Sequence, residues 1–593
     1  MKLYKFGLPI VALALLASCS DDKFDGPKEE TADALYLSLQ IKPVTGTRTA
    51  TGSTGEEVGK TGENEISSAM VILVDENFKV KTSATLSPTK IGSTNNYNAT
   101  GEVDRSKVTD LVDATLKVFV VCNPPSGFNP QPDADIQKVL YAATNDATYN
   151  TFVAKYSTAE NFLMTNADQE KWEITLTAAD LAPGAHLQDN PFPMGPIKVQ
   201  RAVARFDIYT QKGTDGTQQV SVADEDNPLN FTVALADEEG DATISVTLTE
   251  AALLNVSKSF NVFKTLAEAK STSYANTDWK FFLDEYNSTA TAFNYSRVVN
   301  DPESSNKVNF ISANAETPAD LSQIGTYFYN NAFKDNEGVS VQEDPESFTF
   351  KTLNGLENST QKPTNSEIEE IWTGYGIFDY CSANTIHNPA DQKKVISTGV
   401  LFKAQMTGSA FDDAEGGVYV FNGKIYGEFG DLKSYYTAQE TSNNNADFTY
   451  LKRAIEAAMD AYNVAQNNTT VETKVKFTDA SATELALKKY LVAQKFTVYE
   501  PGEDGNYYCY YYYWNRHNDN NAPATMGVME FGVVRNNIYK LRVTDINQLG
   551  HPSKSEDDPT PNKPDDPDED NDFYMSVEVQ VLPWVVRVND IQF

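Results

Sequence analysis

Apolar and polar residues alternate with a period of two in two segments, one near each end of the chain. The apolar positions of the first segment, residues 34–48, are Leu35, Leu37, Leu39 and Ile41. This alternation is typical of a strand with one buried face. A stretch rich in Gly, Thr and Ser follows, and it begins around Arg48, the first Arg of the chain. We therefore predict an N-terminal strand followed by a loop.

The second segment, residues 573–593, lies at the C-terminus. Its candidate strand residues are Phe573, Met575, Val577, Val579 and Val581, and then Trp584. The preceding residues 552–572 contain five Pro and nine acidic residues and no other apolar side chain. Such a stretch buries too little surface to fold, and we interpret it as an extended, self-repelling linker. The pattern predicts an amphipathic strand on a solvated tether.

Most of the chain between these segments reads as strands. Apolar runs predict strands over residues 70–74, 118–121, 198–209, 231–235, 244–248, 418–421 and 538–543. Leu451, Ile455, Met459 and Tyr462 share one helical face, and Leu485 and Val492 do so less cleanly. We expect a mainly β protein with helices inserted into loops of β-sandwiches.

The charge of the chain excludes one class of partner. The 593 residues include 83 acidic and 48 basic residues, which gives a formal net charge of −35. A phosphate backbone needs a cationic face, so we expect no nucleic acid partner. Hydrophobic residues make up 40% of the chain, which is enough for packed cores.

The first twenty residues indicate export. Lys2 and Lys5 precede an apolar run over residues 6–18, which is too short to span a bilayer but suits a signal peptide. The run ends in Leu-Ala-Ser-Cys, which resembles a bacterial lipobox with Cys19 as the acylated residue. An ordinary signal peptide is the alternative. We expect a lipidated precursor held at the outer membrane.

Few residues suggest catalysis or the binding of a metal, a cofactor or a sugar. Cys122, Cys381 and Cys509 stand among apolar or aromatic neighbours, and no CxxC spacing exists, so we predict buried thiols, no metal site and no cofactor. The four His have no recognisable nucleophile partner, and we expect no enzyme activity. The aromatic run over residues 507–514 is interpreted as a half-buried strand, with sugar stacking as the alternative.

A tethered amphipathic strand needs a partner, because its apolar side chains and unpaired backbone would otherwise cause aggregation. The strand could fold back into its own domain, although so long an acidic loop is unusual there. Alternatively, a protease cuts after Arg48, the first strand leaves, and the tail of a neighbouring copy fills the groove. Such a head-to-tail contact need not close on itself, so it produces a filament.

The chain resembles the major fimbrial subunits (fimbrillins) of Bacteroidales, the type V pilins, and in particular the short-fimbria shaft subunits. The resemblance is carried by GVVRNNIY at 532–539, the Pro/Asp linker, MSVEVQVLPW at 575–584, KVQRAVARF at 198–206, KVFVVCN at 117–123 and the lipobox. It implies two transthyretin-like β-sandwich domains, an arginine-specific protease acting on the Arg48–Thr49 bond, and a C-terminal donor strand.

The resulting division of the chain has six parts. We expect a signal peptide at 1–19, a propeptide with the removable strand at 20–48, an N-terminal domain at 49–212, a C-terminal domain with insertions at 213–550, a linker at 551–572 and the donor strand at 573–593. The expected partners are other copies of the chain, accessory fimbrial subunits, the protease, and membrane lipid before processing. The product is a cell-surface fimbria that serves adhesion to an unidentified receptor.

Two alternatives remain open. A glycan-binding surface lipoprotein would stay monomeric and anchored, and it would use tyrosines of the 507–513 run. A tip or anchor subunit of the same pilus class would share the fold. The donor tail favours a shaft subunit over a tip subunit, and the Arg after the first strand favours it over a permanent anchor.

Overall fold

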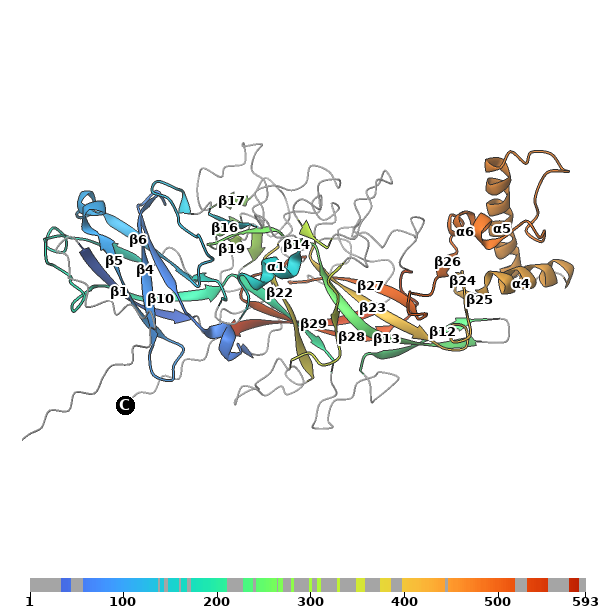
Figure 1. The fold of residues 1–593 in the computed structure, drawn as a ribbon, viewed down its shortest axis with the longest axis horizontal. Coiled ribbons are helices and arrows are strands. Elements are labelled where there is room, and N and C mark those ends of the chain that lie inside the picture. Colours follow the sequence, from blue (N-terminus) through green and yellow to red (C-terminus); the bar gives the residue numbers. More distant parts are fainter. Residues whose placement is uncertain are drawn as a thin grey trace, which may run out of the picture.

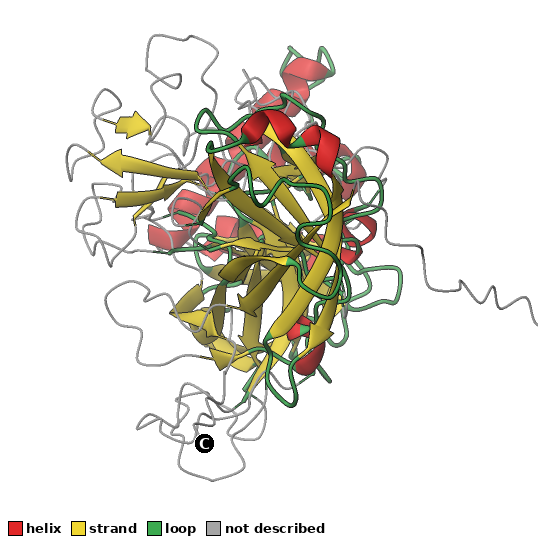
Figure 2. Ribbon diagram, turned by 90° about the vertical axis from the view of Figure 1, so that its left-hand side faces the viewer, coloured by secondary structure: helices red, strands yellow, loops and turns green. Residues whose placement is uncertain are grey.

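The structure is a computed structural model. It describes residues 34–43, 57–136, 139–142, 148–158, 161–167, 172–210, 228–237, 241–263, 265–269, 279–281, 298–300, 307–310, 328–330, 348–357, 374–384, 397–442, 446–517, 531–552 and 575–585. Strands predominate over helices in this part of the chain (Figure 2), and the expected mainly β fold with sandwich-like sheets and a helical insertion is confirmed.

The first sheet is a ring of strands at one end of the molecule (Figure 1). Its strands, in spatial order, are β3 (Ala69–Val74), β4 (Val80–Lys90), β5 (Tyr97–Asp104), β1 (Ala34–Pro43), β10 (Phe192–Arg201), β8 (Met164–Asn166), β6 (Thr115–Cys122) and β9 (Glu173–Thr175). Because β3 also pairs with β6, seven of these strands form a closed circuit. Within this circuit β1 is an interior strand with a neighbour on each side.

Two further sheets form the other half. The second sheet consists of β2 (Glu57–Val58), β29 (Met575–Val585), β28 (Asn537–Ile546), β11 (Val203–Tyr209) and β22 (Tyr375–Ser382). The third consists of β26 (Thr497–Tyr499), β24 (Val418–Phe421), β25 (Lys424–Glu428), β12 (Asn230–Ala236), β13 (Asp241–Leu254), β23 (Gly399–Thr407) and β27 (Tyr507–Trp514), with β21 (Lys351–Thr352) beside β13. Their apolar faces share one continuous core with the first sheet.

Short elements fill in around these sheets. The small sheets are β14 (Val256–Ser257) with β20 (Phe328–Tyr329), β15 (Ser259–Asn261) with β7 (Leu140–Ala142), and β16 (Thr265–Ala269) with β17 (Trp279–Phe281), β18 (Val298–Asn300) and β19 (Lys307–Phe310). The short helices are η1 (Thr61–Asn64), η2 (Arg105–Lys107), η3 (Thr109–Leu111) and α1 (Tyr149–Ala154). Since β7 precedes β11 in the chain and β15 follows it, their pairing links the two halves.

A helical module lies at the end of the molecule opposite the first sheet (Figure 1). It consists of α4 (Phe429–Ser442), α5 (Ala446–Ala465) and α6 (Glu484–Val492), which have a core of their own. The predicted face of α5 is confirmed, since Leu451 and Ile455 are fully buried. The predicted position of Leu485 is wrong because this side chain is 96% exposed, and Leu487 and Leu491 face the core instead. None of the described helices is long and apolar enough to cross a membrane.

The segment 198–209, expected to be one strand, is two strands in different sheets. The chain leaves β10 at Arg201, bends at the fully buried Ala202, and enters β11 at Val203. In β11, Arg205 pairs in parallel with Ile538 of β28. One short stretch of backbone therefore joins the first sheet to the second, while the division expected at 212 stays a prediction.

Candidate functional site

The first strand occupies a two-sided groove in the first sheet. Its side chains Leu35, Leu37 and Ile41 are fully buried and Leu39 is 4% exposed, as their alternation predicted. Complete burial of such a side chain contributes about 1.5–3 kcal/mol. These four residues therefore hold β1 by apolar burial, and removing β1 would open the ring between β5 and β10.

The two walls of the groove differ. Along β5, β1 runs antiparallel in unbroken register from Ala34 opposite Asp104 to Ile41 opposite Tyr97. Along β10 it runs parallel, and the register shifts between Ser38 and Gln40. The partners of those two residues are Pro193 and Pro196, which have no N–H to donate. The β5 wall thus offers a continuous hydrogen-bonding edge and the β10 wall an interrupted one.

Close packing on the far side of β5 keeps this wall in place. Gly101 lies opposite Leu37, and a Cβ added to it would lie 2.2 Å from the Thr85 carbonyl oxygen of β4. That separation is far below van der Waals contact, so only Gly fits. The pairing of β4 with β5 depends on this absence of a side chain.

The amino end of β1 is held by Arg105 and by the loop at 180–186. The Arg105 guanidinium donates hydrogen bonds to the carbonyl oxygens of Ala34 (2.8 Å), Ala185 (2.6 Å) and Asp180 (3.1 Å). The Tyr36 N–H donates to the His186 carbonyl at 2.9 Å. Hydrogen bonds from Thr177 and His186 lower the pKa of Asp180 to about 2, which keeps this carboxylate charged. Arg105 was not identified from sequence, where it is an isolated Arg outside any motif.

Beyond the carboxyl end of β1 the chain passes to the second sheet. Residues 44–56, with the expected processing bond Arg48–Thr49, lie outside the described residues, as does the expected lipidation site Cys19. The chain resumes in β2, which pairs in parallel with β29: Glu57 lies opposite Trp584 and Val58 opposite Val585.

A buried ionic cluster anchors the segment after β2. Arg205 binds Glu63 at 3.2 Å and Asp207 at 2.9 Å, and Lys540 binds Asp207 at 3.2 Å. Tyr380 donates a hydrogen bond to the Glu63 carboxylate at 2.6 Å. These ions lie in the interior of the protein with paired charges. The cluster ties η1, which carries Glu63, to the second sheet.

Arg201 extends this cluster toward the first sheet. Its guanidinium donates to the Glu63 carbonyl at 2.9 Å and to the Asn536 side-chain oxygen at 3.3 Å, and it also contacts Asn64. Burial lowers the pKa of Arg201 to about 9. The signal in the sequence was a set of charged residues within an apolar strand, which sequence reasoning did not interpret.

The C-terminal strand pairs within its own chain. The backbone of β29 runs antiparallel to β28, from Met575 opposite Ile546 to Pro583 opposite Asn537. Val577, Val579, Val581 and Trp584 lie along this strand, and Phe573 lies outside the described residues, as do residues 553–572 of the expected linker. Among the described residues, the strand thus lies beside β28 on one side and beside the two residues of β2 on the other.

The other sequence candidates do not form a second site. Cys122, Cys381 and Cys509 are buried free thiols, as predicted. The aromatic strand β27 puts Tyr507 and Tyr511 into the main core. Its opposite face is more buried than expected, because Tyr510 and Trp514 belong to a smaller apolar cluster. Within the described part of the chain, no group of three or more His, Cys, Asp or Glu is placed to hold a metal.

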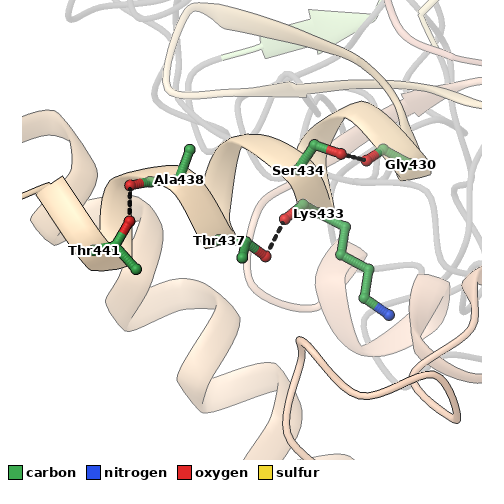
Figure 3. A pocket seen from close by; sticks show the side chains of 6 residues that line it. All are labelled: Gly430, Lys433, Ser434, Thr437, Ala438 and Thr441. Atoms are coloured by element: carbon green, nitrogen blue, oxygen red, sulfur yellow. Dashed lines mark hydrogen bonds between the residues drawn. The ribbon is translucent and has the colours of Figure 1, made fainter.

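One open hollow of about 430 Å³ lies on α4 (Figure 3). Its lining residues are Gly430, Lys433, Ser434, Thr437, Ala438 and Thr441. The Ser434 and Thr437 hydroxyls donate to the carbonyls four residues earlier, and the Lys433 ammonium donates to the carbonyls of Asp479 and Ala482. The polar groups are engaged by the protein itself, so this hollow indicates no ligand.

Comparison with known proteins points to fimbriae. Residues 505–590 match the family model described as major fimbrial subunit protein type IV, fimbrillin, C-terminal. This range contains β27, β28 and β29, and the match supports a relationship to fimbrillins. No curated protein matches the chain.

Solved structures of fimbrial proteins resemble the chain over nearly its whole length. A fimbrilin of Porphyromonas gingivalis W83 is 12% identical, with a TM-score of 0.34, over 94% of this chain and 99% of that one. The tip fimbrial protein Mfa3 of Porphyromonas gingivalis, with a C-terminal truncation, is 9% identical, with a TM-score of 0.30, over 93% of this chain and 100% of that one. At these TM-scores the resemblance adds nothing to a functional assignment.

Proposed function

We propose that this chain is the structural subunit of a fimbrial shaft that polymerises by donor-strand exchange and serves adhesion and colonisation. In this proposal the precursor is exported as a lipoprotein acylated on Cys19 and is held at the outer membrane. An arginine-specific protease cuts between Arg48 and Thr49 and releases β1. The C-terminal strand of a neighbouring subunit, residues 573–593, then fills the groove, and the polymer forms the surface fimbria.

The position of β1 is the observation that carries the proposal. It is an interior strand of a closed ring, yet the chain after it leaves the ring and passes to another sheet. A single cut after residue 48 would therefore free this strand without breaking any other connection of the ring. The groove left behind would expose the apolar sites of Leu35, Leu37, Leu39 and Ile41, which only another amphipathic strand fills well.

The position of the C-terminal strand β29 in its own chain is compatible with this exchange. In its own sheet β29 has a full partner, β28, on one side and a two-residue partner, β2, on the other. In the groove of a neighbour it would have β5 and β10 on its two sides, as β1 does. The groove therefore offers more backbone hydrogen bonds, each contributing about 0.5–1.5 kcal/mol.

The ionic cluster supports the same sequence of events. Glu63 lies fifteen residues after the expected cut and is paired with Arg205 inside the protein. The new N-terminal segment would therefore stay attached to the second sheet after β1 departs.

Deletion of residues 573–593 tests the proposal. Cells that express the deleted chain should export the monomer but show no filaments by electron microscopy, while the full chain forms them. The mature N-terminus of wild-type filaments should be Thr49. Filaments built by the deleted chain would refute the proposal.

The glycan-binding alternative receives less support. In β27, Tyr507, Tyr510 and Tyr511 are buried, and Tyr508 donates a hydrogen bond to Asp504 at 2.7 Å. Little ring surface is left for stacking on a sugar.

A further inference from the structure

Arg105 has a feature that the described residues of the precursor do not explain. Its side chain is 5% exposed and donates to three main-chain carbonyls, but its Nε–H has no hydrogen-bond partner. No carboxylate of the described residues forms an ion pair with it. The Asp180 carboxylate, in the adjoining loop, is bonded to Thr177 and His186 instead. Arg105 is thus a buried cation at the end of the groove whose charge no described carboxylate balances.

Loss of β1 would also remove one of the hydrogen-bond acceptors of Arg105. The carbonyl of Ala34, which accepts from Nη2 at 2.8 Å, belongs to the departing strand. A buried donor that loses its acceptor carries a desolvation penalty, and the penalty is greater for a charged group. The empty groove therefore ends at a guanidinium that requires a carbonyl and favours a nearby negative charge.

The C-terminal region contains both a negatively charged run and a strand whose carbonyls can accept hydrogen bonds, and the charged run comes first. An acidic run, Asp568 to Asp572, directly precedes the alternating apolar and polar positions that begin with Phe573 in the sequence. The first strand has the same arrangement, because Glu29, Glu30 and Asp33 precede Ala34. In both segments the negative charge lies on the amino side of the apolar alternation. A donor strand that runs in the direction of β1 would place its acidic run beside Arg105.

The walls of the groove favour this direction as well. A strand that runs as β1 does is antiparallel to β5, which provides the continuous edge, and antiparallel pairs are slightly more stable than parallel ones. The reverse direction would place the antiparallel ladder against β10, where Pro193 and Pro196 lack N–H groups.

We infer that Arg105 is the docking residue for the donor strand of a neighbouring copy. The donor enters in the direction of β1, with a main-chain carbonyl replacing that of Ala34 and the acidic residues 568–572 balancing the guanidinium. This inference rests on the proposed donor-strand exchange, and it specifies which end of the donor meets which end of the groove.

Disulfide crosslinking tests the direction. Glu102 of β5 is exposed and lies opposite Tyr36 of β1. If Met575 takes the place of Leu35, Ser576 lies opposite Glu102, and a shift of two residues puts Tyr574 there instead. The reverse direction puts Gln580 there. In full-length chains cleaved after Arg48, Glu102→Cys should crosslink between subunits with Ser576→Cys or Tyr574→Cys and not with Gln580→Cys.

A binding measurement tests Arg105 itself. The probe is a labelled peptide of residues 566–585, added to the full chain cleaved after Arg48. Arg105→Gln should weaken peptide binding about tenfold to a hundredfold, the range for a hydrogen bond to a charged group. Arg105→Lys should retain part of the affinity. The control Lys107→Gln, on the same short helix but exposed, should leave it unchanged.

A second peptide separates docking from a general loss of structure. In it the acidic residues of 568–572 are replaced by their amides. If Arg105 interacts with these charges, Arg105→Gln should weaken binding of this peptide much less than binding of the acidic one. A merely structural role would weaken both peptides equally.

The outcomes separate the two proposals. Crosslinking through Gln580→Cys, or equal binding by Arg105→Gln and Lys107→Gln chains, would overturn the role of Arg105 while strand exchange stands. If the wild-type cleaved chain binds no peptide and forms no crosslink or polymer, donor-strand exchange itself is wrong.

Discussion

Truncation of one buried residue of β1 provides a demanding test of strand removal. Leu37 is fully buried, lies opposite Gly101 and occupies the middle of the groove. Leu37→Ala should lower the free energy of unfolding of the precursor by about 2–5 kcal/mol, because it removes buried methyl groups and leaves a cavity. Urea unfolding of the uncleaved chain measures this change.

The substitution destabilises the uncut precursor, but it should favour polymerisation once the chain is cut. After cleavage at Arg48 the strand is held without a covalent link, so the same loss weakens its binding about 30-fold or more. The cleaved Leu37→Ala chain should release the strand faster and form polymers sooner. The finished polymers should match the wild type in resistance to denaturation, because they no longer contain Leu37.

A matched control is available on the helical module. Leu485→Ala removes the same atoms from a side chain that is 96% exposed, so it should change stability by no more than about 0.5 kcal/mol and leave polymerisation unchanged. Slower polymerisation by the cleaved Leu37→Ala chain, or polymers weaker than those of the wild type, would refute the removal of β1.

Three further predictions concern the described interior. Glu63→Gln removes one of the two carboxylates that pair with Arg205, so the buried cations Arg205 and Lys540 share Asp207 alone, and the free energy of unfolding should fall by about 3–5 kcal/mol in urea titrations, an effect that Glu65→Gln should not share. Burial raises the pKa of Cys509 to about 12, and Cys122 and Cys381 are buried as well. In the Cys19→Ser variant, iodoacetamide at pH 8 should therefore label no thiol until urea is added. Labelling of the native chain would contradict the buried positions. Burial lowers the pKa of His517 to about 4, below its unfolded value of about 6.5, so only the unfolded chain gains this proton in that range. The stability from the neutral ring is complete above about pH 6.5 and is lost as the pH falls toward 4, and the drop in urea midpoint from pH 7 to pH 4.5 should be smaller in His517→Gln.

Local patterns predicted the strands and the first strand's buried face well. The alternation in residues 34–41 identified the four side chains that the groove buries, because a period of two has one interpretation when one face is apolar. The helical face of α5 was equally clear. The prediction for Leu485 failed because two apolar residues seven apart define a helical face weakly, and Leu487 and Leu491 fit the core better.

Features that depend on contacts between distant parts of the chain could not be predicted from local sequence patterns. The bend at Ala202 separates two strands within the segment 198–209, whose pattern reads as one continuous strand, and nothing local marks the bend. The role of Arg105 depends on three carbonyls that are distant in the sequence: those of Ala34, Asp180 and Ala185. Similarly, the partners of Glu63 come from β11 and β22, so only the assembled sheets reveal the cluster.

The bend at Ala202 has a mechanical consequence for a filament joined by strand exchange. A tensile load on a subunit would enter through the groove wall β10, pass along the covalent backbone into β11, and reach β28, which leads to the tail that holds the next subunit. Between β10 and β28, the non-covalent step of that route is the parallel ladder from Arg205 opposite Ile538 to Ile208 opposite Leu541. Pulled lengthwise, such a ladder is sheared, so its hydrogen bonds share the force and do not open one after another.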